Sequence, residues 1–502
     1  MEPTDCIVAQ NLIPSEYGLR LRKGYRNWAT GMTGGAVNTV IAFTGQKDAA
    51  TGKKLWAVTP GGIFDCTTDG VTSPTKVVTF VGVGTGAGFG VYTEITNDAG
   101  GRYLFYADEV NGLHMYTEAS ATWSIPSITV ATPANVAYCM VWKGRLWMIL
   151  KDSGDAYYLD VGAISGAATL FNFGAKLSHG GSLKAMFNWT IDGGAGVDDY
   201  LIAVGGGGDV LIYQGTDPTQ ADSFGLVGSW FIGSCPASRR IGLAYGGEMY
   251  LLSTYGVISV RQLMEGIQVA DPANGPSAKI NRFLREAVQE GITSHVWSMA
   301  IYPGDGFMQI IAPFDSTNRF NAVQYQQNLM TQAWGTWNGV PIYSAATWMG
   351  KYIMGTPSGT LILYDGGTDA VSSTSLQGSN IDYTVLTSYQ APGNDGTTFK
   401  RVGLIRPIQI ANQLVSLNVE PAYDYDLTLE IDPASSAPPG TGSLWGVAIW
   451  GVSRWGELPS PKSFVRGGQG MGRTVAILMK GNSATRLTFI GWDVSYTTGG
   501  FL

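Results

Sequence analysis

Short apolar runs broken by glycine turns recur along most of the chain. Three of them centre on Gly144, Gly247 and Gly350, which are equally spaced, and in each a tight turn separates apolar and aromatic positions. Looser copies occupy residues 55–64, 103–115, 200–213 and 299–311. Since a β-propeller blade is built from such hairpins at a period of roughly 40–50 residues, the pattern predicts a β-propeller. We count seven hairpin units, with six as the alternative because the second and fifth are irregular.

One segment of the propeller region has helical periodicity instead. Its apolar positions follow the i, i+3, i+4, i+7, i+8 spacing of an amphipathic stripe, and they are Ile280, Phe283, Leu284, Ala287 and Val288. Ser277 is suited to cap the N-terminus of this helix and Gly291 to end it. The pattern therefore predicts a helical insertion over residues 264–293. It either packs on the propeller flank or projects into an interface or channel.

The repeated pattern of apolar runs broken by a glycine turn ends at residue 371, and a polar linker follows. Apolar runs typical of strands then occupy residues 383–389, 401–410, 415–421, 426–431, 474–479 and 486–496. This spacing favours a separate antiparallel β-sandwich. The sequence thus predicts an all-β protein: a β-propeller of six or seven blades with a helical insertion, and a C-terminal antiparallel β-sandwich-like domain. The predicted units are an N-terminal arm (1–35), the propeller (36–371) and the C-terminal domain (372–502).

Composition supports many short strands and narrows the classes of function. Gly 69 and Trp 15 are plentiful, only 14% of residues are charged, and the net charge is −7. No basic domain exists, so tight binding to nucleic acid through its phosphates is not expected. An acidic wall can still line a DNA passage, because like charges keep a duplex mobile. The four cysteines form no CxxC pair, and neither a signal peptide nor an apolar run of membrane-spanning length is evident, so a soluble protein made in a reducing cytoplasm is expected.

The N-terminal arm carries the most distinctive charges. Four basic and no acidic residues lie between Tyr17 and Ala29, and they are Arg20, Arg22, Lys23 and Arg26. Such a cluster is either a solvated surface or a docking element for an acidic partner or DNA phosphate. We take these four residues as the candidate partner-binding site.

Motifs for cofactor or metal chemistry do not fit their required context. The glycine-rich run from Gly82 to Ala87 is followed by another strand-like segment, whereas a dinucleotide site needs a helix there. The three histidines, His114, His179 and His295, are isolated from one another and from cysteine at ligand spacing. We therefore expect no cofactor and no metal.

Carboxylates are the remaining route to catalysis, because some propellers hydrolyse glycosides with paired acids. A row comprising Asp424, Asp426, Glu430 and Asp432 alternates as one face of a strand would, which suits calcium or, more simply, solvent. A hydrolase would draw its pair from Asp152, Asp198 and Asp424. No sialidase-type box supports this, so we expect the protein not to be an enzyme.

The two ends of the chain resemble a known family. Asn11-Leu12-Ile13-Pro14 followed by Gly18-Leu19-Arg20-Leu21-Arg22-Lys23-Gly24-Tyr25, and the ending Ile490-Gly491-Trp492-Asp493-Val494-Ser495-Tyr496 with Gly499-Gly500-Phe501-Leu502, are similar to tail nozzle proteins of short-tailed bacteriophages, also called tail hub or packaged-DNA stabilisation proteins. The layout agrees over the whole chain. The low charge and a longer glycine-rich insertion at residues 81–90 depart from the family pattern.

The resemblance implies a structural component of the virion tail, assembled in the host cytoplasm. Six copies would form a ring below the portal and adaptor proteins, surround and gate the channel through which double-stranded DNA is ejected, and dock tail fibres or spikes. The four basic residues of the arm would then anchor the subunit. Two alternatives stay open: a propeller that binds glycans through exposed tryptophans, and a propeller glycoside hydrolase.

Overall fold

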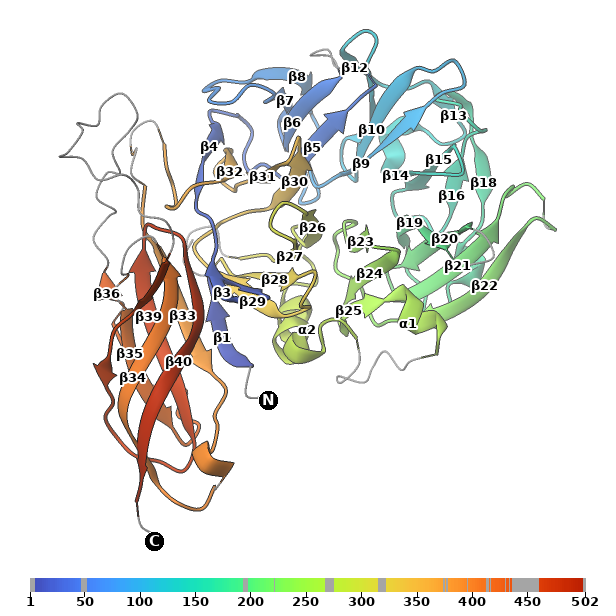
Figure 1. The fold of residues 1–502 in the computed structure, drawn as a ribbon. Coiled ribbons are helices and arrows are strands. Elements are labelled where there is room, and N and C mark those ends of the chain that lie inside the picture. The colour runs from blue at the N-terminus through green and yellow to red at the C-terminus, as the bar shows by residue number, and fades with distance from the viewer. Residues whose placement is uncertain are drawn as a thin grey trace.

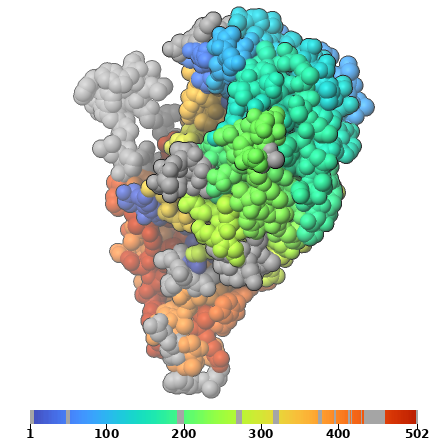
Figure 2. Space-filling view, turned by 90° about the vertical axis from the view of Figure 1, so that its right-hand side faces the viewer, coloured from blue at the N-terminus to red at the C-terminus, as the bar shows by residue number. Residues whose placement is uncertain are grey.

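The computed structural model describes residues 5–46, 52–192, 197–220, 222–266, 275–314, 322–372, 375, 378–394, 396–411, 415, 417–428, 430–432, 434–435 and 460–499. Over these residues the chain forms a β-propeller with a β-sandwich beside it (Figure 1). The space-filling view shows the sandwich extending beyond the propeller, so that the molecule tapers towards one end (Figure 2).

The first four blades are regular four-stranded antiparallel sheets. Blade 1 contains β5 (Thr39–Thr44), β6 (Lys53–Thr59), β7 (Gly62–Asp65) and β8 (Thr75–Thr79). Blade 2 contains β9 (Val91–Thr96), β10 (Arg102–Asp108), β11 (Gly112–Thr117) and β12 (Thr122–Ser124). Blade 3 contains β14 (Val136–Trp142), β15 (Arg145–Leu150), β16 (Ala156–Tyr158) and β18 (Thr169–Phe171). Blade 4 contains β19 (Leu183–Asp192), β20 (Val197–Gly205), β21 (Asp209–Gly215) and β22 (Phe224–Phe231).

The last three blades depart from this pattern. Blade 5 has three strands, β23 (Gly242–Tyr245), β24 (Glu248–Ser253) and β25 (Gly256–Ser259), and then the short helix α1 (Val260–Met264). Blade 6 contains β26 (Ser298–Tyr302), β27 (Phe307–Ile311), β28 (Gln324–Asn328) and β29 (Trp334–Trp337). Blade 7 contains β30 (Ser344–Trp348), β31 (Lys351–Gly355), β32 (Leu361–Tyr364) and, from the other end of the chain, β4 (Tyr25–Ala29). The described residues therefore make a propeller of seven blades.

The three equally spaced glycine phrases are two-residue hairpin turns. Lys143 and Gly144 have φ of 49° and 70°, and the flanking Trp142 and Arg145 are paired. Positive φ at both central residues is what a type I′ turn requires, and glycine adopts it without a steric penalty. The turns at Gly247 and Gly350 have the same sign of φ at both positions, which explains why this phrase marks blades so clearly.

The sandwich consists of two sheets with an apolar core between them. One sheet contains β33 (Ile381–Thr387), β39 (Val475–Ser483), β35 (Leu417–Tyr423) and β36 (Ala434–Ser435). The other contains β2 (Leu12–Ser15), β3 (Gly18–Leu21), β40 (Leu487–Thr498), β34 (Lys400–Ala411), β37 (Ser460–Ser463) and β38 (Arg466–Gly467). Leu12 and Leu21 from the N-terminal hairpin are buried in this core together with residues of the C-terminal strands.

One strand joins the two lobes. β1 (Cys6–Gln10) pairs with β29 of blade 6 through Gln10 and Thr336, and it pairs along its length with β33 of the sandwich. Blade 6, β1 and the β33-containing sheet of the sandwich therefore form one continuous hydrogen-bonded sheet. Hydrogen bonds in a shared sheet oppose hinge motion between the lobes, because bending there would break the ladder.

The boundaries predicted for the N-terminal arm need correction. Residues 1–35 were expected to form an arm outside the blades, but β4 is the outermost strand of blade 7 and β2–β3 belong to the sandwich. The strand signal was present in Tyr25–Ala29. The prediction was wrong because its partner, β32, lies far away in the sequence, and a local pattern contains no information about such pairing.

The helix predicted between Ser277 and Gly291 is present but differs in detail, and residues 267–274 of the predicted insertion lie outside the described residues. A 3-10 turn, η3 (Ala278–Ile280), precedes α2 (Asn281–Glu290), and the Ser277 hydroxyl accepts a hydrogen bond from Val257 N instead of capping the helix. Leu284 and Val288 are buried against the propeller, whereas Phe283 is 60% exposed. The helix packs on the flank of its own domain, through contacts with β25.

The acidic row in the C-terminal domain is not a strand face. β35 ends at Tyr423, and Asp424 and Tyr425 both have positive φ, which turns the chain. The Asp424 carboxylate accepts hydrogen bonds from the backbone N–H groups of Arg473 and Thr474. The described residues of 426–431 therefore form no strand and follow a turn that the Asp424 carboxylate stabilises.

Smaller elements complete the described part of the chain. β13 (Ile128–Thr129) and β17 (Gly166–Ala167) form a two-stranded parallel sheet. The other 3-10 turns are η1 (Pro133–Asn135), η2 (Gly174–Lys176) and η5 (Pro392–Asn394).

Candidate functional site

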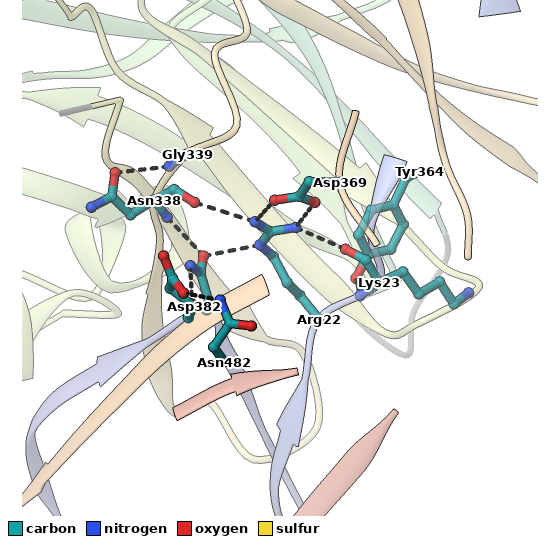
Figure 3. Close-up of polar contacts among 9 residues, drawn as sticks. Arg22, Lys23, Asn338, Gly339, Tyr364, Asp369, Asp382 and Asn482 are labelled. Carbon is teal, nitrogen blue, oxygen red and sulfur yellow. Dashed lines mark hydrogen bonds and ion pairs between the residues drawn. The ribbon is translucent and has the colours of Figure 1, made fainter. Parts of the chain in front are cut away.

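Arg22 lies at the junction of the two lobes and is only 2% exposed. Its two terminal nitrogens bind both carboxylate oxygens of Asp369 at 2.7 and 2.6 Å, and its Nε donates to Asn11 Oδ1 at 2.9 Å (Figure 3). The remaining N–H groups donate to the backbone carbonyls of Lys23 and Asn338. A guanidinium has five N–H donors, and all five are used here. The side chain therefore has no capacity left for a partner.

The charge of Arg22 is stabilised by its surroundings. Burial on its own would lower the pKa of this guanidinium, but the charge and hydrogen bonds of Asp369 outweigh it and raise the pKa. The guanidinium also lies 5.9 Å from the centre of the Trp337 ring, within the range of a cation–π interaction. A buried ion pair of this kind fixes geometry, and removing one partner leaves the other charge uncompensated.

Asn11 connects this ion pair to both lobes. Its Oδ1 accepts hydrogen bonds from Arg22 Nε and, at 2.8 Å, from the backbone N–H of Asn338 after β29. Its Nδ2 donates to the Asp382 carbonyl of β33 at 2.6 Å. The backbone φ of Asn11 is 59°, a left-handed conformation that asparagine tolerates better than most residues. The position thus needs both an amide and a left-handed backbone, which few residues other than asparagine supply.

Arg20 and Lys23 share one carboxylate. Asp305, in the turn between β26 and β27, lies 3.4 Å from Arg20 and 3.1 Å from Lys23. Lys23 Nζ also lies 5.6 Å from the Tyr302 ring centre and 5.5 Å from that of Tyr364. Arg20 is the more open of the two, with 37% of its side chain exposed against 19% for Lys23.

Arg26 closes the ring of blades. It forms a bidentate ion pair with Asp69, at 2.8 and 2.6 Å, which joins β4 of blade 7 to the β7–β8 connection of blade 1. The hydrogen bond to Asp69 raises the pKa of Arg26, and the same bond lowers the pKa of Asp69. About a third of each side chain is exposed, so solvent screens this pair.

All four predicted partner-binding residues are therefore engaged within their own chain. For Arg22 the hypothesis of partner docking is corrected, because its burial and its full set of intramolecular bonds leave no contact surface. Arg20, Lys23 and Arg26 keep some exposure, but each already faces a carboxylate. In the sequence no acidic partner was evident for the four cations, because Asp305, Asp369 and Asp69 lie far from them along the chain.

The residues that sequence analysis missed are Asn11, Asp369 and Asn338. Asn11 was noted only as part of a phrase, although an asparagine between two strand-like runs is a signal for a left-handed turn. Nothing near Asp369 or Asn338 in the sequence marks them as partners of Arg22.

The carboxylates considered for hydrolysis do not form a pair in the described structure. Asp152 lies in the β15–β16 turn of blade 3, whereas Asp424 lies at the end of β35 in the sandwich. The side chain of Asp198, on β20, lies outside the described residues. Searching the described part of the chain gives no group of three or more His, Cys, Asp or Glu side chains able to hold a metal ion.

The glycan-binding alternative needs exposed tryptophans. Among the described residues no tryptophan is exposed: Trp28, Trp56, Trp142, Trp147, Trp189, Trp297 and Trp337 are at most 2% exposed, and the others are buried or half-buried. Trp445, Trp450 and Trp455 lie outside the described residues. In the described structure most tryptophans are therefore core residues.

Other features also have structural explanations. Cys66, Cys139 and Cys235 are buried free thiols, and burial raises the pKa of each, to about 12 for Cys66 and Cys235. His179 is held by Asp209, which accepts from its backbone N–H at 2.7 Å. No helix in the described ranges is long and apolar enough to cross a membrane.

Comparisons with known proteins find similarity among solved structures. No protein-family model matches the chain, and no curated protein matches it. The WD40 β-propeller domain of Doa1 is similar with a TM-score of 0.39 and 11% identity, covering 68% of this chain and 96% of that one. YCF48, solved with a D1 peptide bound, has a TM-score of 0.36 and 11% identity, covering 73% and 99%. The computationally designed Ika8 protein has a TM-score of 0.37 and 9% identity, covering 68% and 99%.

Proposed function

We propose that this protein is a structural subunit of a short phage tail, the hexameric nozzle or hub that attaches below the portal and adaptor proteins. The proposal rests mainly on one observation: the two sequence phrases that resemble the family, one near each end of the chain, lie close together in the structure. Leu19 pairs with Phe489 and Arg20 pairs with Thr488, so the opening phrase lies beside β40, the strand that continues into the closing phrase. Phrases from opposite ends of a chain that form one structural element are better explained by a shared architecture than by two separate coincidences.

The fixed arrangement of the two lobes suits a protein that forms the wall of a DNA channel. The continuous sheet through β1 holds the sandwich against blade 6, and β4 closes the ring of blades. A body fixed in this way can be stacked into a ring and keep a constant inner diameter. The net charge of −7 would keep passing DNA mobile, because phosphate and an acidic wall repel each other.

The ion pairs at the junction change the proposed role of the basic cluster. We assign to Arg22, with Asn11 and Asp369, the task of fixing the relative position of the two lobes within one subunit. Attachment to the portal and adaptor would then use other surfaces. Replacing all four basic residues together would test folding as much as docking, since Arg22 is buried.

The test is assembly in the presence of a portal–adaptor stub, followed by mass photometry. We expect six copies per stub, or a free ring of six, for the wild-type chain. Arg20→Glu, which changes the most exposed of the four cations, is expected to fold and to assemble normally. A stable trimer, or a monomer that ignores the stub, would contradict the proposal. Sugar binding or cleavage by the purified chain would favour the glycan-binding or hydrolase alternative instead.

A further inference from the structure

The propeller encloses a cavity on its axis. The innermost strands of the blades, β5, β9, β14, β19, β23, β26 and β30, face the centre of the ring (Figure 1). Between them lies a cavity of about 400 Å³ to which all seven blades contribute. Its wall is about equally polar and apolar: Met140, Met186 and Met299 line it, and so do Arg239 and Arg240. This volume falls within the range of small-molecule sites.

Arg240 reaches across one mouth of this channel. It precedes β23 of blade 5, and its terminal nitrogens donate to the carbonyls of Asn38 at 2.8 Å, His295 and Val296 at 3.2 Å and Tyr343 at 3.3 Å. These carbonyls lead into the innermost strands of blades 1, 6 and 7. No carboxylate pairs with Arg240 among the residues that the structure describes. The cation is thus held by backbone carbonyls and by the Phe89 ring, whose centre lies 5.4 Å away, and all of these groups are neutral.

Positive charge is in excess around this mouth. Arg239 is paired with Glu109 at 2.7 Å, and Lys184 lies close enough to interact electrostatically with both. Burial lowers the pKa of Arg240 to about 10, and burial, followed by the charge of Arg239, lowers the pKa of Lys184. Lys184 also interacts with the carboxylate of Asp152, so three cations face two carboxylates, and an anion here would relieve the cost of burying the remaining positive charge.

Several buried polar atoms at the same place lack partners. Arg240 Nε, Ser298 Oγ and Asn38 Oδ1 are all buried and make no hydrogen bond within the described structure. Arg240 and Ser298 are neighbours through a β-bridge, and both line the cavity. The first is a donor and the second can be one, so together they offer two donors to an oxyanion. Orphaned buried donors are rare in proteins and indicate a bound water or ligand.

We propose that the axial channel binds a small oxyanion, a phosphate or carboxylate group carried on an apolar body. Arg240 and the Ser298 hydroxyl contact the oxyanion, and the methionine-lined wall of the channel receives the apolar part. The proposal does not depend on the function proposed above, because it concerns the axis of one propeller and not the assembly of several copies.

Isothermal titration calorimetry of the full chain tests the site with defined probes. Hexyl phosphate and hexanoate represent the two possible head groups, and inorganic phosphate and 1-hexanol each lack one half of the expected ligand. We expect one saturable site for hexyl phosphate, hexanoate or both, with an affinity well above those of inorganic phosphate and 1-hexanol. Equal binding of hexanol and the two anions, or no saturable binding of either anion, would overturn the proposal.

Amino-acid substitutions test whether the oxyanion binds at Ser298 and Arg240. Ser298→Ala removes a hydroxyl that has no partner in the chain, so the variant is expected to fold like the wild type and to bind the anion about tenfold more weakly. Arg240→Lys keeps the positive charge but loses the planar fork, and it should weaken binding further. Ser229→Ala, on the outer strand β22, is the matched control and should bind normally. Undiminished affinity in Ser298→Ala and Arg240→Lys would place the ion elsewhere and overturn the proposal.

Discussion

The propeller and the sandwich are both mainly antiparallel, but their strands pair with partners at very different distances along the chain. In blade 3, Trp142 pairs with Arg145, whereas in the sandwich Leu19 pairs with Phe489. The propeller is a series of local hairpins, and the sandwich depends on both ends of the chain meeting. The blades should therefore tolerate local changes, while changes in the N-terminal segment should affect both lobes together.

The largest effect is expected at Arg22. Arg22→Ala leaves the buried Asp369 carboxylate and the Asn11 amide without their partner, which should cost about 3–5 kcal/mol in the free energy of unfolding. Urea unfolding followed by tryptophan fluorescence measures it. The double variant Arg22→Met/Asp369→Leu should recover part of the loss, because no buried charge then remains unpaired. A loss below about 1 kcal/mol for Arg22→Ala would contradict the role of this pair.

Asn11 should follow with a smaller effect. Asn11→Ala removes three hydrogen bonds and places alanine at a φ of 59°, so about 2–4 kcal/mol of stability should be lost. Asn11→Gly loses the same bonds without the backbone strain, so it should be about 1 kcal/mol more stable than Asn11→Ala. Equal stability of the two variants, measured by the same denaturation, would show that the left-handed conformation contributes nothing.

These positions also show what sequence can and cannot predict. The two-residue turns at Gly144, Gly247 and Gly350 are local, so the glycine between apolar positions predicts a hairpin directly. The seven-bladed ring and the sandwich follow from such signals, as does the helix around Leu284. β4 and the Arg22–Asp369 pair could not be predicted, because closing the ring and joining the lobes requires contacts between residues more than three hundred positions apart.

The buried cysteine thiols should make the propeller less stable at alkaline pH. The pKa of Cys66 and of Cys235 is raised from 9.0 to about 12 by burial, so between these values the unfolded chain releases protons that the folded chain retains. Stability therefore falls as pH rises above about 9, by about 1 kcal/mol per thiol between pH 8 and pH 10. Cys66→Ala/Cys235→Ala should show a shallower decline in urea unfolding over this range. An identical decline would mean that these thiols do not contribute.

The smallest effect is expected at Arg26. Its pair with Asp69 is about one third exposed, so Arg26→Ala should cost about 0.2–1 kcal/mol, and less at high salt. Because the bond to Arg26 lowers the pKa of Asp69, this contribution is present at neutral pH and is lost as pH falls through that lowered pKa. Urea unfolding at two salt concentrations measures it. A loss as large as that of Arg22→Ala would erase the distinction between the buried and exposed pairs.

A cut in the loop before β5 tests most directly whether the N-terminal segment is internal to both lobes. Gly34 and Gly35 are exposed, so a protease site inserted between them should be cleaved in the folded protein. We predict that the fragment ending at Gly34 stays bound through β1 to β4, co-elutes with the remainder on gel filtration, and separates only in denaturant. Release of the fragment under native conditions from a propeller that remains folded would contradict this account.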